Sequence, residues 1–472
     1  MSNYRTPGVY IEEIQKFPPS VAPVETAIPV FIGYTEKARK DGRDLTLDPL
    51  RISSLLEYQT FFGGPQKEIG IEVVFDEQTS GGSTYTAQFN EATGGSLHIM
   101  YYCLQQYFAN GGGPCWIISV GSFTPFGQVI SNSQPFLDAL DAIRKEDEPT
   151  LIIFPEGQGM SRGEYFAIQQ QSLRVCEEMK DRFAIIDFYD RVDPSRTAGD
   201  IAELAEEFRT DIGINDLKYG AVYFPNIRST FNYDVEESSV ILIHNVNGGE
   251  GNGEFNELTF NELNDANKAQ VRLAINNFSI DLPPSASMAG LYAKVDRERG
   301  VWKAPANVSI LGIDGLTFKV TDAIQDGLNI DVVAGKSINA LRFFTGKGFL
   351  VWGARTLAGN DNEWRYVPVR RFFNFAEESI KKATEAFVFE PNDANTWNRV
   401  KSLIENFLVL QWRAGALQGP TPEQSFFVNV GLGETMTALD ILEGRLIVEI
   451  GMAVVRPAEF IILRFSHKMA EA

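Results

Sequence analysis

Three side chains of this sequence follow one another in the chain order that one kind of hydrolase uses: Asp187, His244 and Ser287. A serine hydroxyl becomes a nucleophile when a histidine accepts its proton, and an aspartate holds that histidine in the required tautomer. Such a group would cleave an acyl or peptide bond. It works only if the elements that carry the three residues bring them together.

The local context of these residues argues against this chemistry. The run SASMAG (285–290) is similar to the run around the nucleophile of subtilisin-like proteases, but it has Ser285 where those enzymes have glycine. His244 follows Ile241-Leu242-Ile243 in a predicted strand that leads into a glycine-rich loop. No asparagine is evident that would complete an oxyanion hole. We predict that the chain is not an enzyme, and the hydrolase remains an alternative.

Phosphate-binding and metal-binding patterns lack essential residues. TGKG (345–348) has no glycine four residues earlier and no Ser or Thr after its lysine, whereas a phosphate loop needs both. GGEGNG (248–253) precedes no helix, and in NGGGP (110–114) Gly111 is explained as a helix stop. The three cysteines and three histidines show no ligand spacing. We expect no cofactor and no metal.

Composition narrows the class of protein and its partners. The net charge of −20 argues against a nucleic-acid partner. From Gly335 to the end, 16 Lys+Arg stand against 15 Asp+Glu, which leaves 26 against 47 before it, so a nearly neutral C-terminal part follows an acidic one. No apolar run could span a bilayer and residues 1–5 start no signal peptide. We expect a protein that is made and kept in the cytoplasm, or that leaves it by a route other than a cleaved signal, and that does not insert into a membrane directly.

The middle of the chain alternates apolar runs with helical stretches. The runs PTLIIFPEG (149–157), RFAIIDFYD (182–190) and YGAVYFPNI (219–227) are bounded by turn residues, and helices are predicted at Tyr165–Asp181 and Ala198–Thr210. This alternation indicates an α/β fold with a parallel sheet and crossover helices. Sites in such sheets lie at the carboxyl ends of the strands. Any site would therefore lie near Pro155-Glu156-Gly157, Asp187 and Asp190.

The chain length of 472 residues predicts two to four domains. We predict that residues 1–50 hold an arm and a first strand that pack with the C-terminal domain. Residues 51–334 form an acidic α/β region, in which the Gly/Asn/Ser-rich stretches 79–96 and 247–258 read as exposed loops or hairpins. Residues 335–472 form a C-terminal domain of the α+β class.

The N-terminus reads as a strand that lacks a nearby partner. Val9-Tyr10-Ile11 is followed by prolines at 18, 19, 23 and 29 before the strand Val30-Phe31-Ile32. Proline holds the chain extended and lacks an N–H donor, so a tight hairpin between the two strands is excluded. An unpaired strand edge is normally paired or covered. A distant segment of the chain or another molecule must therefore receive this strand.

The C-terminus also reads as strands. Leu446–Val455 is one prediction and Glu459–Phe465 is another. The second strand alternates in the pleated pattern, with Ile461, Leu463 and Phe465 on one face and Phe460, Ile462 and Arg464 on the other. Either the two termini pair within one molecule, or copies exchange strands by β-augmentation.

Two helices are predicted in the C-terminal part. In residues 375–387, Phe375, Ile380, Ala383 and Phe387 form an apolar stripe, and Lys381 and Lys382 lie on the polar side, each four residues after a glutamate. That spacing also describes an exposed helix whose charges satisfy one another. The helix Ala394–Arg413 is predicted to be core through Trp397, Val400, Ile404, Phe407 and Leu408.

Eight segments, in order along the whole chain, resemble contractile tail sheath proteins, which form the sheaths of phage tails and of related contractile injection particles. They are TPGVYIEEI (6–14) with ETAIPVFIGYTEKA (25–38), YFANGGGPCWIISV (107–120), PPSASMAGLYAKVDRERGVWKAPAN (283–307), FFTGKGFLVWGARTL (343–357), WRYVPVRRFFNFAEESI (364–380), FEPNDANTWNRV (389–400) and GALQGPTPEQSFFV (415–428). The stretches 64–96 and 229–263 depart from the family pattern.

The resemblance implies a multidomain fold in which residues 135–334 approximately are subtilisin-like but inactive. It implies stacked hexameric rings around an inner tube, with contraction that drives the tube through a target envelope without nucleotide hydrolysis. Val9, Tyr10, Ile11 and Glu12 would pair with a neighbouring subunit next to its 446–465 region. Lys381 and Lys382 are the first candidates for contact with the tube, and Arg370 and Arg371 are the second.

The implied partners are other copies of the chain, paralogous sheath subunits, the inner tube protein, and baseplate and terminator or cap proteins. The location would be a virion tail or a tail-like particle, either released or membrane-anchored. A non-contractile tail terminator or baseplate-proximal homologue of the same fold is the alternative within the family.

Overall fold

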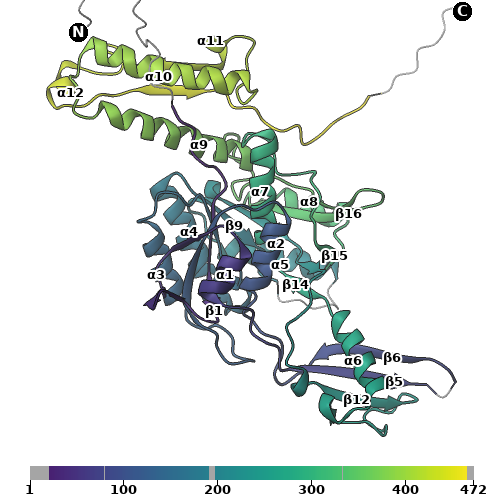
Figure 1. Cartoon of the computed structure of the whole chain (residues 1–472). Helices are drawn as coiled ribbons and strands as arrows, with labels where there is room; N and C mark the ends of the chain where they lie inside the picture. The colour runs from purple at the N-terminus through teal and green to yellow at the C-terminus, as the bar shows by residue number, and fades with distance from the viewer. Residues whose placement is uncertain (1–20, 79, 191–196, 332, 465–472) are drawn as a thin grey trace, which may run out of the picture. The chain divides into compact units, whose positions relative to one another are not determined.

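The computed structural model describes residues 21–78, 80–190, 197–331 and 333–464, and its elements are labelled in Figure 1. These residues form two compact units. Unit 1 joins residues 21–24 to Ala376–Val455, and unit 2 joins Glu25–Phe375 to residues 456–464. Each unit is therefore built from segments that lie far apart in the sequence.

Unit 2 is organised around an eight-stranded sheet of order β17-β16-β10-β9-β8-β1-β7-β4. The strands from β16 to β7 in this order run parallel, and the two edge strands are antiparallel. This confirms the predicted parallel sheet. The bounds are β1 Pro29–Thr35, β4 Leu50–Ile52, β7 Cys115–Ser122, β8 Leu151–Ile153, β9 Phe183–Asp187, β10 Gly220–Phe224, β16 Ile338–Phe344 and β17 Gly348–Val351.

Two predicted domain boundaries differ from the structure. The first strand of the chain, β1, pairs with β7 and β8 in the sheet of unit 2, so residues 25–50 do not belong to the C-terminal unit. The strand β16 pairs with β10, which moves the boundary predicted at residue 335 to residue 375. Both differences arise because strands join a sheet through hydrogen bonds to partners that are distant in sequence, and composition carries no record of these partners.

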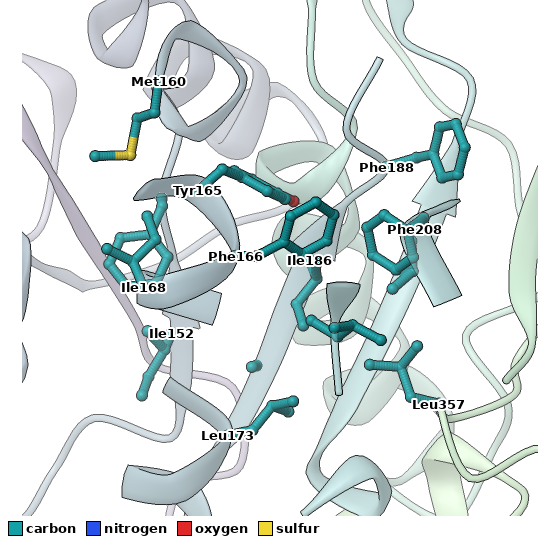
Figure 2. Close-up of a cluster of buried hydrophobic side chains, with 14 of the residues drawn as sticks. Ile152, Met160, Tyr165, Phe166, Ile168, Leu173, Ile186, Phe188, Phe208 and Leu357 are labelled. Atoms are coloured by element: carbon teal, nitrogen blue, oxygen red, sulfur yellow. The ribbon is translucent and has the colours of Figure 1, made fainter. Parts of the chain in front are cut away.

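Helices cover both faces of this sheet. Along β1, Val30 and Ile32 enter one core while Phe31 enters the other, as the pleat requires. The first core packs against α3 (Gln134–Ile143), α4 (Arg162–Met179) and α5 (Ala198–Asp211), and Figure 2 shows Phe166, Phe188 and Phe208 gathered beside Ile186. The second core packs against α1 (Leu55–Phe62), α2 (Met100–Ala109) and α7 (Ser285–Arg299).

The two variable stretches meet in a second sheet of order β13-β12-β5-β6. Its strands are β5 Ile71–Glu77, β6 Ser83–Phe89, β12 Ile241–Val246 and β13 Leu258–Thr259. β5 and β12 pair in parallel, and α6 (Asp265–Asn276) contributes Val271 and Ile275 to a separate core. The sequence predicted loops or hairpins here, and the hairpin β5–β6 is one of them. That 64–96 and 229–263 fold together was not predicted.

The remaining elements of unit 2 are short. They are β2 Arg39–Lys40, β3 Arg43–Asp44, β11 Ile227–Ser229, β14 Ile280–Leu282, β15 Ile313–Leu316 and α8 Asp322–Asn329. Single turns of 3-10 helix lie at Gly157–Gly159, Leu217–Tyr219, Glu237–Ser239 and Phe260–Glu262. Among the described helices, none combines the length and the hydropathy that a bilayer crossing requires.

Unit 1 is a helical layer with one small sheet. The helix α9 (Val367–Thr384) begins in unit 2 and continues into unit 1, where the 3-10 turn Glu385–Phe387 follows it. The other elements are α10 Ala394–Arg413, α11 Pro422–Ser425, β18 Phe426–Asn429, α12 Ala438–Leu442 and β19 Glu449–Met452. The bounds of α10 match the prediction, and its predicted core residues Val400, Ile404, Phe407 and Leu408 are buried.

Candidate assembly site

Asp187, His244 and Ser287 do not form a catalytic group. His244 lies in β12, where Nε2 contacts Glu77 Oε2 at 3.1 Å and Nδ1 accepts the Phe255 N–H at 3.2 Å. Both ring nitrogens are therefore engaged within the second sheet. Ser287 is completely buried in α7. The hydrolase alternative built on these three residues is wrong, because the histidine cannot reach the serine proton.

The role of Asp187 is to hold the start of α7. Its carboxylate accepts the Ser285 N–H at 2.8 Å and the Ser285 Oγ–H at 2.7 Å. The first N–H groups of a helix have no partner within the helix, so a carboxylate there satisfies one of them. Burial raises the pKa of Asp187 from 3.8 to about 7, against the lowering effect of the Ser285 hydrogen bonds. The run SASMAG is thus explained by helix packing.

A cleft of about 390 Å³ lies at the position predicted for a site in the parallel sheet. Glu156, Asp190 and Asn226, which follow β8, β9 and β10, are among its lining residues. The Glu156 side chain is buried beneath it, where Oε2 accepts the Tyr34 N–H at 2.9 Å and Oε1 lies 3.5 Å from His98 Nδ1. No cluster of three or more metal-binding side chains occurs in the part of the chain that the structure describes.

The structure describes only part of the predicted terminal strands. Val9, Tyr10, Ile11, Glu12 and Phe465 lie outside the described residues. Residues 457–464 form no strand, and the exposed fractions of Phe460, Ile461, Ile462 and Leu463 are 65, 79, 77 and 72%. The predicted strand Glu459–Phe465 is therefore absent from the described single chain. A strand needs a neighbouring strand to accept and donate its backbone hydrogen bonds. Residues 459–464 pair with no strand in the described chain.

The predicted strand Leu446–Val455 is shorter than expected and forms part of a small sheet. β19 pairs antiparallel with β18, with Val428 opposite Ile450 and Phe427 opposite Gly451. A Cβ on Gly451 would lie 2.1 Å from the Phe427 ring, so the glycine makes room for this aromatic side chain. In a two-stranded sheet each strand keeps one edge without a strand partner. This sheet could therefore accept further strands.

Arg370 and Arg371, the second candidates for contact with the tube, are not surface residues in the structure. Arg370 and Arg371 are each only 3% exposed. The guanidinium of Arg370 lies 4.3 Å from the ring centre of Trp364, and Arg371 NH1 donates to Asp296 Oδ1 at 3.0 Å. Arginines placed in the first half of α9 are satisfied inside unit 2, so they present no charge to a partner there.

The first candidates remain on the surface of α9. The side chain of Lys381 is 62% exposed and that of Lys382 is 36% exposed. Both approach Glu378, at 3.1 and 3.5 Å. The predicted pairing of Glu378 with Lys382 is confirmed. The Glu378 side chain is only 8% exposed and is shared by both lysines, so the more exposed ammonium groups of Lys381 and Lys382 remain available to a partner.

Several known proteins are similar to this chain in sequence. Residues 359–468 match the family described as phage tail sheath C-terminal domain. The tail sheath protein of Vibrio phage KVP40 is 30% identical over 130 residues, and a putative prophage major tail sheath protein of Pseudomonas aeruginosa (strain UCBPP-PA14) is 30% identical over 111 residues. These matches cover 27 and 24% of this chain, and only 19 and 28% of the relatives.

Solved structures match over nearly the full length. The helical sheath of the anti-feeding prophage in its contracted state shares 31% identity, with 98% of this chain and 100% of that chain covered and a TM-score of 0.65. The sheath complex of an extracellular contractile injection system called PVC, also contracted, shares 30% identity, with 99% of each chain covered and a TM-score of 0.66. This chain belongs to the family of contractile tail sheath proteins.

Proposed function

We propose that this chain is the repeating structural subunit of a contractile sheath. Copies polymerise as stacked rings around an inner tube and contract, without nucleotide hydrolysis, to drive the tube through a target envelope. The identity of about 30% to two contracted sheaths over nearly all of both chains supports this role. The sheath is assembled in the cytoplasm as part of a phage tail or tail-like particle, with the inner tube, baseplate and terminator proteins as partners.

The observation that carries the proposal is the exposed apolar segment at the C-terminus. Four consecutive large apolar side chains, Phe460 to Leu463, are each at least 65% exposed. Isolated exposed apolar residues are ordinary, but a contiguous run marks a surface that a partner covers. As a strand this run would be apolar on both faces, and β18–β19 keeps unpaired edges. The simplest occupant of such an edge is this segment from another copy.

Strand exchange of this kind has a useful magnitude. Each backbone hydrogen bond contributes about 0.5–1.5 kcal/mol net, so a strand of four residues contributes a few kcal/mol. One such junction is weak, but a subunit in a lattice makes several junctions at once, and their combined effect is far larger than either alone. The N-terminal residues Val9, Tyr10, Ile11 and Glu12 supply a second junction in this proposal.

Truncation tests the proposal. A variant that ends at Glu459 lacks the apolar segment, and a control variant that ends at Phe465 retains it. We expect both to show wild-type circular dichroism and thermal transitions, because the four apolar side chains of the segment are at least 65% exposed in the single chain. Only the control should form helical tubes in negative-stain electron microscopy. Normal tubes from the shorter variant would overturn the proposal.

A specific observation supports a second candidate within the family. A chain in the baseplate structure of the anti-feeding prophage shares 31% identity over 99% of this chain, with a TM-score of 0.65. A baseplate-proximal or terminator subunit would cap an assembly and would not repeat along it. The same microscopy separates the two candidates, since a capping subunit forms single rings and a repeating subunit forms tubes.

A further inference from the structure

The C-terminal segment is held at one residue immediately before it becomes exposed. The Glu459 carboxylate accepts Arg355 Nε–H at 2.9 Å on Oε1 and Arg355 NH2 at 2.6 Å on Oε2. Asn329 Nδ2 donates to Oε1 at 2.9 Å, and the Tyr366 hydroxyl donates to Oε2 at 3.1 Å. The side chain of Arg355 is 5% exposed and that of Glu459 is 21% exposed. Bidentate arginine pairs of this kind fix both distance and orientation.

The C-terminal segment passes from a paired residue to an exposed one within a single position. Val454 and Val455 belong to unit 1, where Val455 N–H donates to Ala416 O at 3.0 Å. Glu459 is held within unit 2, and Phe460, the next residue, is already 65% exposed. Whatever the apolar segment contacts, its starting point is set by Glu459.

The N-terminal segment shows the same arrangement. Arg371 NH2 donates to Thr26 O at 2.8 Å, and Thr26 Oγ–H donates to Asp296 Oδ2 at 2.6 Å. Asp296 and Arg371 form a pair whose side chains are 7 and 3% exposed. Two residues earlier, Val24 belongs to unit 1 and donates its N–H to Ser379 Oγ at 3.2 Å. Thr26 is therefore the point where the N-terminal segment joins unit 2.

We propose that Glu459 and Thr26 are anchors that fix the roots of the two terminal segments, with Arg355 and Arg371 as positioning residues. The inference rests on the proposed strand exchange and adds residues that strand pairing itself does not involve. An exchanged strand places its neighbour accurately only if its root is fixed. A fixed root also lowers the entropy lost on pairing and raises the effective concentration of the segment at its acceptor.

Loss of an anchor should change the position of the terminal segment as well as the stability of the unit. Replacing Glu459 leaves the buried Arg355 without its carboxylate and removes the contact to Asn329 at the end of α8, so it should also lower the stability of unit 2. The variants are therefore compared only under conditions in which circular dichroism shows each of them to be folded. The Glu459→Gln variant keeps the shape of the side chain but removes the charge that pairs with Arg355. Tyr366→Phe removes only one hydrogen bond and is the milder variant.

Electron spin resonance measures the position of the root directly. The native cysteines Cys103, Cys115 and Cys176 are completely buried, so labels can be placed at Ala458→Cys and Lys319→Cys, both exposed positions of unit 2. Labelled full-length chain is diluted into unlabelled chain so that only distances within one copy are recorded. We expect one narrow distance distribution in the parent, a broad one with Glu459→Gln, and intermediate broadening with Tyr366→Phe.

The control is Glu363→Gln in the same labelled background. It removes one exposed carboxylate from unit 2 and should leave the distribution narrow. A narrow distribution with Glu459→Gln would overturn the anchor. A broad distribution together with an unchanged critical concentration for tube formation would overturn its role in assembly. Failure of the proposed function is seen separately, as normal tubes from the variant that ends at Glu459.

Discussion

Two adjacent isoleucines of the C-terminal segment allow a test of which of its faces becomes buried on assembly. Ile461 and Ile462 are adjacent, have the same side-chain type, and are 79 and 77% exposed in the single chain. In a strand they point to opposite faces of the sheet. Substituting each by asparagine therefore produces two variants that are matched in the single chain and differ only in the assembled state.

The magnitude follows from the exposed fraction. Complete burial of an isoleucine side chain stabilises by about 1.5–3 kcal/mol. Because 79% of Ile461 remains to be buried, the asparagine variant should lose about 1.2–2.4 kcal/mol per junction if its face is covered. Since about 1.4 kcal/mol corresponds to a factor of ten, the association constant falls roughly 8- to 60-fold. A residue on the solvent face of the accepting sheet should lose much less.

The assay is the critical concentration for tube formation, measured by sedimentation and checked by electron microscopy. We expect thermal transitions of both variants to equal those of the parent, and the two critical concentrations to differ by about tenfold or more. Equal and large effects would mean that both faces are covered. Wild-type critical concentrations for both variants would refute the reasoning, because neither side chain would then enter an interface.

Three further predictions concern residues whose environment the structure defines. Asp187→Asn should flatten the pH dependence of stability. Burial raises the pKa of Asp187 from 3.8 to about 7, so the folded state binds the extra proton and the parent loses stability as the pH rises through this window. Between about pH 5 and about pH 8 the parent should lose at most about 3 kcal/mol more than the variant in chemical denaturation. Asp296→Asn leaves the buried Arg371 without its carboxylate and should destabilise unit 2 by about 3–5 kcal/mol in chemical denaturation. The control Glu237→Gln breaks a pair with Arg272 whose side chains are 44 and 55% exposed, and should cost under about 1 kcal/mol. Equal effects of the two substitutions would contradict the view that the Asp296–Arg371 pair is a buried one. Lys381→Gln combined with Lys382→Gln should weaken co-sedimentation with the inner tube protein but leave the thermal transitions unchanged. The control is the same charge change at the exposed residues Lys319 and Lys347. Unchanged tube binding by the first double variant would show that Lys381 and Lys382 do not contact the tube.

Much of the architecture follows from local sequence patterns. The runs around Leu151–Ile153, Phe183–Asp187 and Gly220–Phe224 are apolar on both faces, which is typical of buried parallel strands. The helix α10 was predicted with its bounds and with four of its five core residues, Trp397 being only partly buried, because its apolar positions recur at helical spacing over five turns. Such signals need only neighbours along the chain.

The errors have one common cause, which is that partners distant in the sequence leave no local signal. Arg370 and Arg371 read as surface charges, but Trp364 and Asp296 enclose them in unit 2. The strands β5 and β12 pair across about 170 positions of the chain, which no composition shift records. Nothing near Glu459 in the sequence indicated Arg355, which is 104 residues away.

The sequence by itself determined the parallel sheet, the helix α10 and the likeness to contractile tail sheath proteins, because these depend on short-range periodicity and on motifs that keep their order. The helix predicted at residues 375–387 is α9, which begins at Val367 and ends at Thr384. Only the tertiary structure decided which charges are buried, which segments share a unit, and where the terminal segments are held. Those properties depend on what the folded chain places beside each residue. An arginine in water and an arginine enclosed by a carboxylate and aromatic rings have the same one-letter code.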